Sequence, residues 1–115
     1  MVNKKRSLNL VVLRSPDLER AKSFYENLLS CKFDEHLDHG PKHYGISLGE
    51  VYLEIYSTKE NRPSIDSFGF HVPSIDEVIN KLGNECIHRA ARESSFGRYA
   101  IIKDPDNRLV HISED

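Results

Sequence analysis

Aliphatic and polar side chains alternate along residues 51–57 of this chain, and such alternation is typical of a β-strand. Because successive side chains of a strand point to opposite faces, this strand separates an aromatic, acidic face from an aliphatic one. The first face carries Tyr52, Glu54 and Tyr56, and the second carries Val51, Leu53 and Ile55. Apolar, β-branched runs between turn residues predict further strands at 8–13, 32–38, 43–48, 68–72, 86–94, 97–103 and 108–113.

Two other stretches repeat their apolar residues every three to four positions, as a helix with one buried face does. The first predicts a helix over about residues 16–29, with Ser15 at its N-cap and Pro16 as its first helical residue. The second predicts a helix that begins at a capping box, Ser74 to Glu77, and ends at Gly83.

The order strand, helix, strand, strand, strand therefore occurs twice. The two modules cover about residues 7–57 and 67–114, and a polar, proline-containing linker at residues 58–66 joins them. A duplicated supersecondary unit describes the whole fold, and 115 residues is the size of a single domain. The sequence predicts one α+β domain, residues 1–115, made of two βαβββ modules.

The last two predicted strands are joined by Asp104-Pro105-Asp106-Asn107. Proline fixes its own φ, and Asp and Asn side chains bond to nearby backbone, so this run predicts a tight turn. Residues 98–114 should then form a hairpin, whose second strand carries His111.

Charge and composition exclude two kinds of partner. The formal net charge is −2, and the only basic run, Lys4 to Arg6, is short, so binding to nucleic acid is not expected. No apolar run approaches the ~20 residues that span a membrane, and the first residues lack the apolar core of a secretory signal. Cys31 and Cys86 lie far apart without CxxC spacing, as expected of free thiols that pack in a reduced cytoplasm.

Three segments together resemble the vicinal oxygen chelate superfamily, the group of glyoxalase I, bleomycin resistance proteins and extradiol dioxygenases. They are D-L-E-R-A-x-x-F-Y at residues 17–25, F-G-F-H-V-P at residues 68–73 and K-D-P-D-N-R-L-V-H-I-S-E at residues 103–114. The resemblance covers nearly the whole chain. It implies two βαβββ modules whose curved sheets form a cup for a small molecule, and a homodimer in which the second copy commonly completes the cup.

In metal-dependent members four strand positions supply the ligands, and the resemblance places them at Leu10, Glu54, Phe70 and His111. Only Glu54 and His111 can donate to a metal. A catalytic zinc site uses three protein ligands and a water, so two donors favour a cup without a metal; a divalent Zn, Ni, Fe or Mn ion is the alternative. The neighbouring His71 should face away from Phe70's side unless a β-bulge turns it.

The aromatic, acidic face of residues 51–57 is the candidate ligand-binding surface. Tyr52 and Tyr56 flank Glu54, and apolar rings with a few polar groups are typical of small-molecule pockets. If Glu54 and His111 met in one cup, their carboxylate and imidazole could transfer a proton, which makes them the catalytic candidates.

The remaining candidates would complete the ligand contacts. At their implied positions Leu10 and Phe70 would add apolar walls. Arg98 or Arg92, beside the turn before the final hairpin, could hold an anionic group. His36, His39 and His43 have spacing that can bind a metal, but no matching carboxylate or cysteine, so we predict surface histidines.

Three functions stay open from the sequence. The first is a protein that binds a small molecule, without the full metal site. The alternative is a glyoxalase-like metal-dependent lyase or isomerase, or a dioxygenase. The second alternative is a structural or regulatory dimer without catalysis. The sequence does not identify the ligand, and it does not decide whether the protein is an enzyme.

Overall fold

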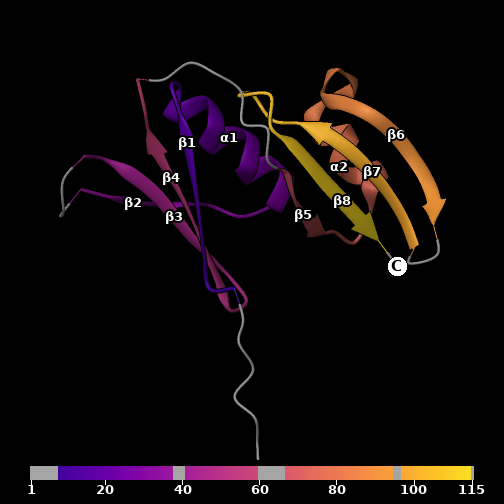
Figure 1. Cartoon of the computed structure of the whole chain (residues 1–115), viewed down its shortest axis with the longest axis horizontal. Coiled ribbons are helices and arrows are strands. Elements are labelled where there is room, and N and C mark those ends of the chain that lie inside the picture. Colours follow the sequence, from indigo (N-terminus) through magenta and orange to yellow (C-terminus); the bar gives the residue numbers. More distant parts are fainter. Residues whose placement is uncertain (1–7, 38–40, 60–66, 95–96, 115) are drawn as a thin grey trace, which may run out of the picture.

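The computed structural model describes residues 8–37, 41–59, 67–94 and 97–114, and it consists of two βαβββ modules (Figure 1). The first contains β1 (Leu10–Ser15), α1 (Leu18–Leu29), β2 (Asp34–His36), β3 (His43–Leu48) and β4 (Val51–Ser57). The second contains β5 (Ser67–His71), α2 (Ile75–Leu82), a 3-10 turn (Asn84–Cys86), β6 (Ile87–Ser94), β7 (Gly97–Lys103) and β8 (Leu109–Glu114). This order confirms the predicted α+β class and the duplicated module.

Each module forms its own four-stranded mixed sheet. Sheet A has the strand order β1-β4-β3-β2, and sheet B has the corresponding order β5-β8-β7-β6. In each sheet the first strand of the module pairs in parallel with the last one, and the other pairs are antiparallel. The two sheets therefore have the same topology, as a duplicated unit requires.

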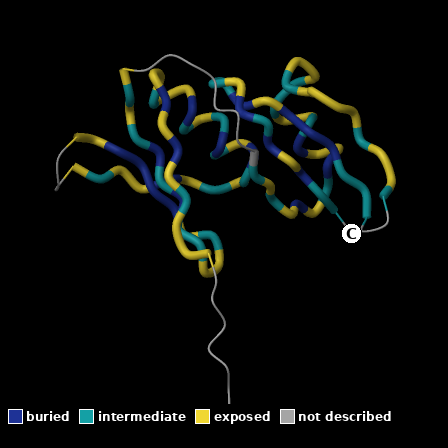
Figure 2. The backbone as a smooth tube through the Cα atoms, viewed as in Figure 1, coloured by how far each residue is buried: buried dark blue, intermediate teal, exposed yellow. Residues whose placement is uncertain are grey.

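Both helices pack on one side of the sheets, and the core lies there. The fully buried side chains, Tyr25 of α1 among them, come from both modules, and Figure 2 shows the buried segments of the two sheets on either side of α1. Tyr25 reaches the second module, with ring centroids 6.3 Å from Phe68 and 6.4 Å from Phe70. No helix in the described part of the chain is long and apolar enough to cross a membrane.

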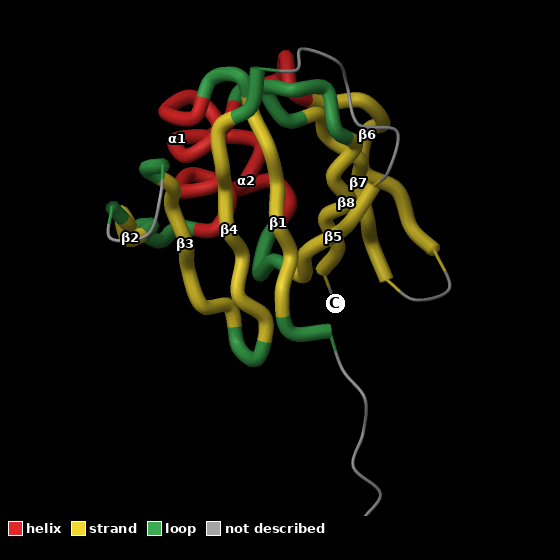
Figure 3. The backbone as a smooth tube through the Cα atoms, turned by 60° about the vertical axis from the view of Figure 1, so that its left-hand side comes forward, coloured by secondary structure: helices red, strands yellow, loops and turns green. Residues whose placement is uncertain are grey.

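The sheet surfaces turned away from the helices are called free face A and free face B. Free face A carries Leu10, Val12, Arg14, Asp34, His36, His43, Gly45, Ser47, Tyr52, Glu54 and Tyr56. Free face B carries Gly69, His71, Arg89, Arg92, Tyr99, Ile101, Lys103, Leu109, His111 and Ser113. The helices lie behind sheet B in Figure 1 and behind sheet A in Figure 3, so the two free faces point in different directions.

The first helix starts later than predicted. Ser15 does not cap it but continues β1, where it pairs with Ser57 and is completely buried. Asp17 is the N-cap instead, and its carboxylate accepts a hydrogen bond from the backbone N–H of Arg20. The sequence pattern was ambiguous because both Ser and Asp are favoured caps, and the extra strand pairing decided between them.

The second helix and most strands agree with the prediction. Ser74 caps α2 by accepting from the backbone N–H of Glu77, and Gly83 ends the helix. The second strand is shorter than residues 32–38, because it pairs with β3 only from Asp34 to His36. The linker at residues 58–66 lies largely outside the described residues, as does His39.

The predicted DPDN turn forms a buried polar contact between the modules. Asp104 accepts hydrogen bonds from the Tyr25 hydroxyl at 2.5 Å and from the Arg108 guanidinium at 2.7 Å, and it also accepts from the backbone N–H of Asp106. Arg108 donates in addition to the backbone carbonyl of Arg14 at the end of β1. Asp104 and Arg108 are only 3% and 7% exposed. Buried groups of this kind need partners, so the network fixes β1 against the second module.

Candidate functional site

Strand β4 supplies the centre of free face A. Leu53 and Ile55 are buried toward α1, which turns Tyr52, Glu54 and Tyr56 to the other side of the sheet. This is the division of faces that the alternation predicted. These three side chains are half-buried, because neighbouring strands cover part of each.

A histidine from β3 completes this centre. The Nε2 atom of His43 lies 3.5 Å from Oε2 of Glu54, and the His43 ring stacks on Tyr56 with centroids 4.3 Å apart and planes 7° from parallel. The Nδ1 atom lies 3.1 Å from the Pro41 carbonyl, which can only accept, so Nδ1 carries a hydrogen. Nε2 is therefore the atom at which the imidazole can gain or lose a proton, directly beside the Glu54 carboxylate.

A second hydrogen-bonded pair, His36 and Tyr52, joins His43, Glu54 and Tyr56 in one cluster on free face A. Nε2 of His36 lies 2.9 Å from the Tyr52 hydroxyl, and the His36 and His43 rings are 5.2 Å apart. Burial, followed by the negative charges of Glu54 and Asp34, raises the pKa of the Tyr52 hydroxyl. Tyr52 therefore keeps its proton near neutral pH, and the tautomer of His36 decides whether the hydroxyl or Nε2 donates in this hydrogen bond.

The Tyr52 ring lies against Gly45 of β3, where any Cβ atom would require the ring to shift. A Cβ atom added at Gly45 would lie 2.7 Å from Cζ of Tyr52, a distance that real Cβ atoms essentially never show. Gly45 therefore makes the space into which the Tyr52 ring fits.

Strand β1 borders the cluster with an apolar edge and one cation. Leu10 is 47% and Val12 39% exposed on free face A, and the Arg14 guanidinium lies 5.7 Å from the centroid of the Tyr56 ring. Leu10 thus shares the face of Glu54, where the implied ligand position placed it.

His111 lies on free face B, in the other sheet from Glu54. It is exposed on β8, opposite Gly69 of β5. A Cβ atom added at Gly69 would lie 3.0 Å from Cβ of His111. The two catalytic candidates therefore lie on different sheets of one chain, Glu54 on sheet A and His111 on sheet B (Figures 1 and 3).

Two other predicted residues face the helix side. Phe70 packs against the core and lines an apolar hollow of about 330 Å³ between the modules, together with Val11, Leu53 and Phe68. It therefore does not share a face with His111, whereas His71 does, because β5 alternates without a bulge. Arg98 also lies on the helix side. Its guanidinium pairs with Asp76 of α2 at 3.3 Å and with Glu114 at 3.4 Å.

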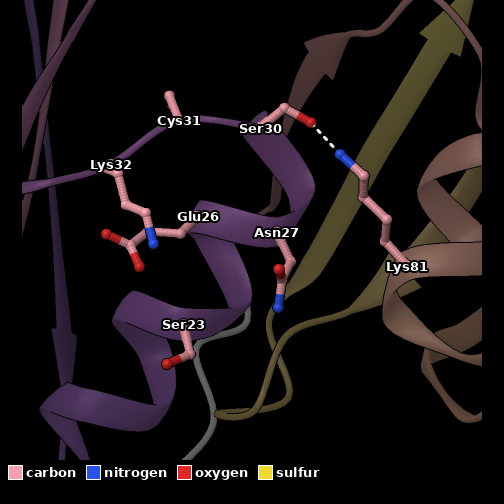
Figure 4. Close-up of a pocket in the computed structure, with 7 residues that line it drawn as sticks. All are labelled: Ser23, Glu26, Asn27, Ser30, Cys31, Lys32 and Lys81. Carbon is pink, nitrogen blue, oxygen red and sulfur yellow. Dashed lines mark hydrogen bonds between the residues drawn. The ribbon is translucent and has the colours of Figure 1, made fainter.

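A polar hollow of about 500 Å³ lies at the end of α1 (Figure 4), and its polar groups serve the local structure. Lys81 donates to the Ser30 hydroxyl and also lies 3.7 Å from Glu77, and Glu26 accepts from the backbone N–H of Phe33 at 2.9 Å. Burial raises the pKa of the Cys31 thiol, which disfavours the nucleophilic thiolate. We assign this hollow no chemistry.

The described residues of one chain do not fit a metal ion. They contain no group of three or more His, Cys, Asp or Glu side chains that could hold one. Asp34, His36, His43 and Glu54 lie on free face A and His71 and His111 on free face B, but no three of them come together as such a group. A catalytic zinc site needs three protein ligands that converge on one point.

Sequence reasoning missed His43, which it placed among surface histidines. His43 is only 8% exposed. A signal was available in the two-residue turn Gly49-Glu50: counting back from it pairs residue 48 with 51 and therefore 43 with 56. That register puts the imidazole beside Tyr56 and diagonal to Glu54.

Comparison with known proteins places the fold. The chain matches the sequence model of the Glyoxalase/Bleomycin resistance protein/Dioxygenase superfamily over residues 7–112. No curated protein matches it in sequence. Similar solved structures include a glyoxalase-related enzyme from Fulvimarina pelagi, with 16% identity over 96% of this chain and 89% of that chain and a TM-score of 0.71.

Two further structures have the same fold. A glyoxalase/bleomycin resistance protein/dioxygenase family enzyme from Burkholderia phytofirmans is 16% identical over 95% of this chain and 98% of that chain, with a TM-score of 0.73. Oxidase ChaP-H2 is 16% identical over 97% of this chain and 95% of that chain, with a TM-score of 0.75. At this identity the similarity describes the fold alone.

Proposed function

Because this chain belongs to the Glyoxalase/Bleomycin resistance protein/Dioxygenase superfamily, we propose that it binds a small molecule in a cup shared by two copies. Free face A of one copy and free face B of the other form the walls. The observation that carries the proposal is the cluster on free face A, where His43 pairs with Glu54 between Tyr52 and Tyr56. Aromatic walls around a few polar groups are typical of ligand pockets.

A homodimer is supported by what the single chain leaves exposed. Leu10 and Val12 are exposed beside the edge of sheet A, and apolar surface of this kind often marks an interaction site. The charges of the faces are complementary: Asp34 and Glu54 lie on free face A, and free face B carries arginine and lysine but no described carboxylate. Pairing the two faces would also place the second copy's His111 across from Glu54.

Each residue then has a role in the proposed cup. His43 and Glu54 bind the polar part of the ligand and can transfer a proton at Nε2, as a general acid–base pair does. Tyr52 and Tyr56 flank the ligand, and Leu10 provides an apolar wall. We propose that this binding needs no metal. Cys31 and Cys86 are free thiols, which agrees with the reducing cytoplasm where we place the protein.

A metal-dependent lyase, isomerase or dioxygenase is the second candidate. A shared cup would gather His43, Glu54 and the second copy's His111, which is the number of protein ligands that a catalytic zinc site uses. Elemental analysis of the purified protein separates the two functions. Near-stoichiometric Zn, Ni, Fe or Mn that is lost in His111→Ala would support the metal enzyme and contradict the metal-free cup.

The direct test of the proposal is a thermal-shift screen with thiol adducts, catechols and glycopeptide antibiotics, because a ligand that binds only the folded state raises its stability. A true ligand should stabilise the wild type and should lose this effect in Glu54→Gln. Glu50→Gln, which changes an exposed carboxylate in the β3–β4 turn, is the matched control. A ligand that stabilises Glu54→Gln equally would contradict the proposal, and a dimer that no ligand stabilises would favour a structural or regulatory role.

A further inference from the structure

The two free faces differ in charge, and the difference bears on the chemical class of the ligand. Free face B carries Arg89, Arg92 and Lys103, and none of its described positions holds a carboxylate. The chain as a whole has a formal net charge of −2. The basic face is therefore a local arrangement and does not follow from the composition.

Glu93, Glu114 and Asp76 lie on the helix side of sheet B, because Glu93 and Glu114 both pair in register with Arg98, whose guanidinium contacts Asp76. Asp76 and Glu114 pair there with Arg98, and Glu114 accepts a further hydrogen bond of 2.6 Å from the backbone N–H of Ile75. These carboxylates are separated by the sheet from the cations of free face B. Arg89, Arg92 and Lys103 form no ion pair with any described residue.

Arg92 is oriented by its own contacts. Its Nε donates to the Tyr99 hydroxyl at 3.1 Å, and its guanidinium carbon lies 5.7 Å from the centroid of the Tyr99 ring. The ring thus positions the guanidinium, and the terminal N–H groups have no partner among the described residues. Such a pair of donors matches the two oxygens of a carboxylate or phosphonate.

The three cations surround an apolar centre. Arg92 pairs in register with Tyr99, Arg89 with Ile101 and Lys103 with Leu109. With about 3.4 Å per residue along a strand and about 4.8 Å between strands, one small ligand can reach more than one cation. An apolar body would then rest on the half-buried Tyr99 ring.

We infer that the ligand is a small organic acid, with an aromatic or apolar body and a carboxylate or phosphonate bound by Arg92 together with Arg89 and Lys103. The inference rests on the proposed function, because free face A supplies the other wall. Across the shared cup four cationic side chains would face two carboxylates: Arg14, Arg89, Arg92 and Lys103 against Asp34 and Glu54. Like charges gathered in a cleft concentrate counter-ions there.

Calorimetric titration with four probes of one ring and different charge tests the inference: benzoate, phenylphosphonate, benzamide and benzylamine. The wild type should bind at least one anion roughly tenfold more tightly than benzamide, as charge-assisted hydrogen bonds provide. Added salt should weaken this binding. The double variant Arg89→Gln/Arg92→Gln should lose the preference, whereas Arg20→Gln, which removes one positive charge from the exposed surface of α1, should keep it.

The outcomes separate the inference from the proposed function. If benzamide or benzylamine binds as tightly as either anion and Glu54→Gln abolishes that binding, the inference is overturned and the cup stands. If none of the four probes binds, the inference is overturned as well, and the cup is judged by the wider ligand screen. An anion preference that persists in Arg89→Gln/Arg92→Gln would also overturn it.

Discussion

The His43 imidazole and the Glu54 carboxylate lie 3.5 Å apart on neighbouring strands, with only 10% and 18% of their side-chain surfaces exposed. The Pro41 carbonyl occupies the other ring nitrogen, so the two side chains share one proton-binding position. Partial burial strengthens such a pair because water screens it less. This pair is the candidate acid–base group of the proposed site.

Replacing the imidazole by a ring without nitrogen separates stacking from proton chemistry. His43→Phe keeps an aromatic ring on Tyr56, so the free energy of unfolding should change by less than about 1.5 kcal/mol, as for a volume-conserving change. Affinity for a ligand found in the thermal-shift screen should fall at least tenfold, because Glu54 loses its partner. Glu50→Gln, at an exposed residue of the turn after this strand, is the control. Unchanged affinity in His43→Phe would remove the pair from the site.

A side chain at Gly45 should destabilise the fold as long as Tyr52 is present. Gly45→Ala places a methyl group against the Tyr52 ring, and overpacking of this kind costs about 1–3 kcal/mol of unfolding free energy. Tyr52→Ala should relieve most of that cost, so a double-mutant cycle measured by urea denaturation should give a coupling of about 1 kcal/mol or more. Additive effects of the two changes would show that Gly45 has another role.

The buried Tyr25–Asp104 hydrogen bond should contribute more to stability than the partly buried Tyr44–Glu19 bond. Tyr25 and Tyr44 both donate to a carboxylate at 2.5 Å, but Asp104 is buried whereas Glu19 is exposed. Tyr25→Phe should cost about 1–3 kcal/mol of unfolding free energy, because it leaves a buried acceptor with one partner fewer. Tyr44→Phe should cost less, since water can replace its bond to Glu19. Equal losses in urea denaturation would contradict a special role for the Asp104 turn.

Stability should fall in alkaline solution. Burial, followed by the nearby Asp104 carboxylate, raises the pKa of Tyr25 well above its usual value. Above about pH 10, the usual tyrosine pKa, the unfolded chain loses this proton while the folded chain keeps it. The unfolded state then binds fewer protons, so the free energy of unfolding decreases as pH rises. Urea denaturation between about pH 8 and 11 should show this slope.

Tyr25→Phe provides the control for this pH dependence. The variant should lose part of the alkaline slope and retain the rest, because the pKa values of Tyr44 and Tyr52 are raised too. A slope identical to that of the wild type would mean that Tyr25 does not titrate differently in the two states.

Most of the fold could be predicted because its signals are local. Residues 43–48, 51–57 and 97–103 form strands with the predicted bounds, since alternation and flanking turn residues act within a few positions. The start of α1 could not be predicted from its caps, because Ser15 pairs with Ser57, a residue 42 positions away. Tertiary pairing overrode a favourable local pattern.

The candidate site was predictable only within one strand. Tyr52, Glu54 and Tyr56 follow from alternation in β4, but His43 joins them through the register of the β3–β4 hairpin. The relation of Glu54 to His111 depends on how the modules pack, and each module's own pattern contains no information on that packing. Counting ligand positions from the motifs also failed to predict that Phe70 faces α1, where its ring centroid lies 6.4 Å from that of Tyr25.

The shared cup is tested most directly by sedimentation equilibrium of the wild type, Val12→Glu and Leu37→Glu at micromolar concentration. The wild type should have twice the mass of the chain, and Val12→Glu should have the mass of one chain, because pairing of the free faces would bury an unpaired carboxylate. Leu37→Glu, at a leucine that is 63% exposed beyond the opposite edge strand β2, should remain a dimer. A wild type with the mass of a single chain, or a dimer that Val12→Glu leaves intact, would contradict the shared cup.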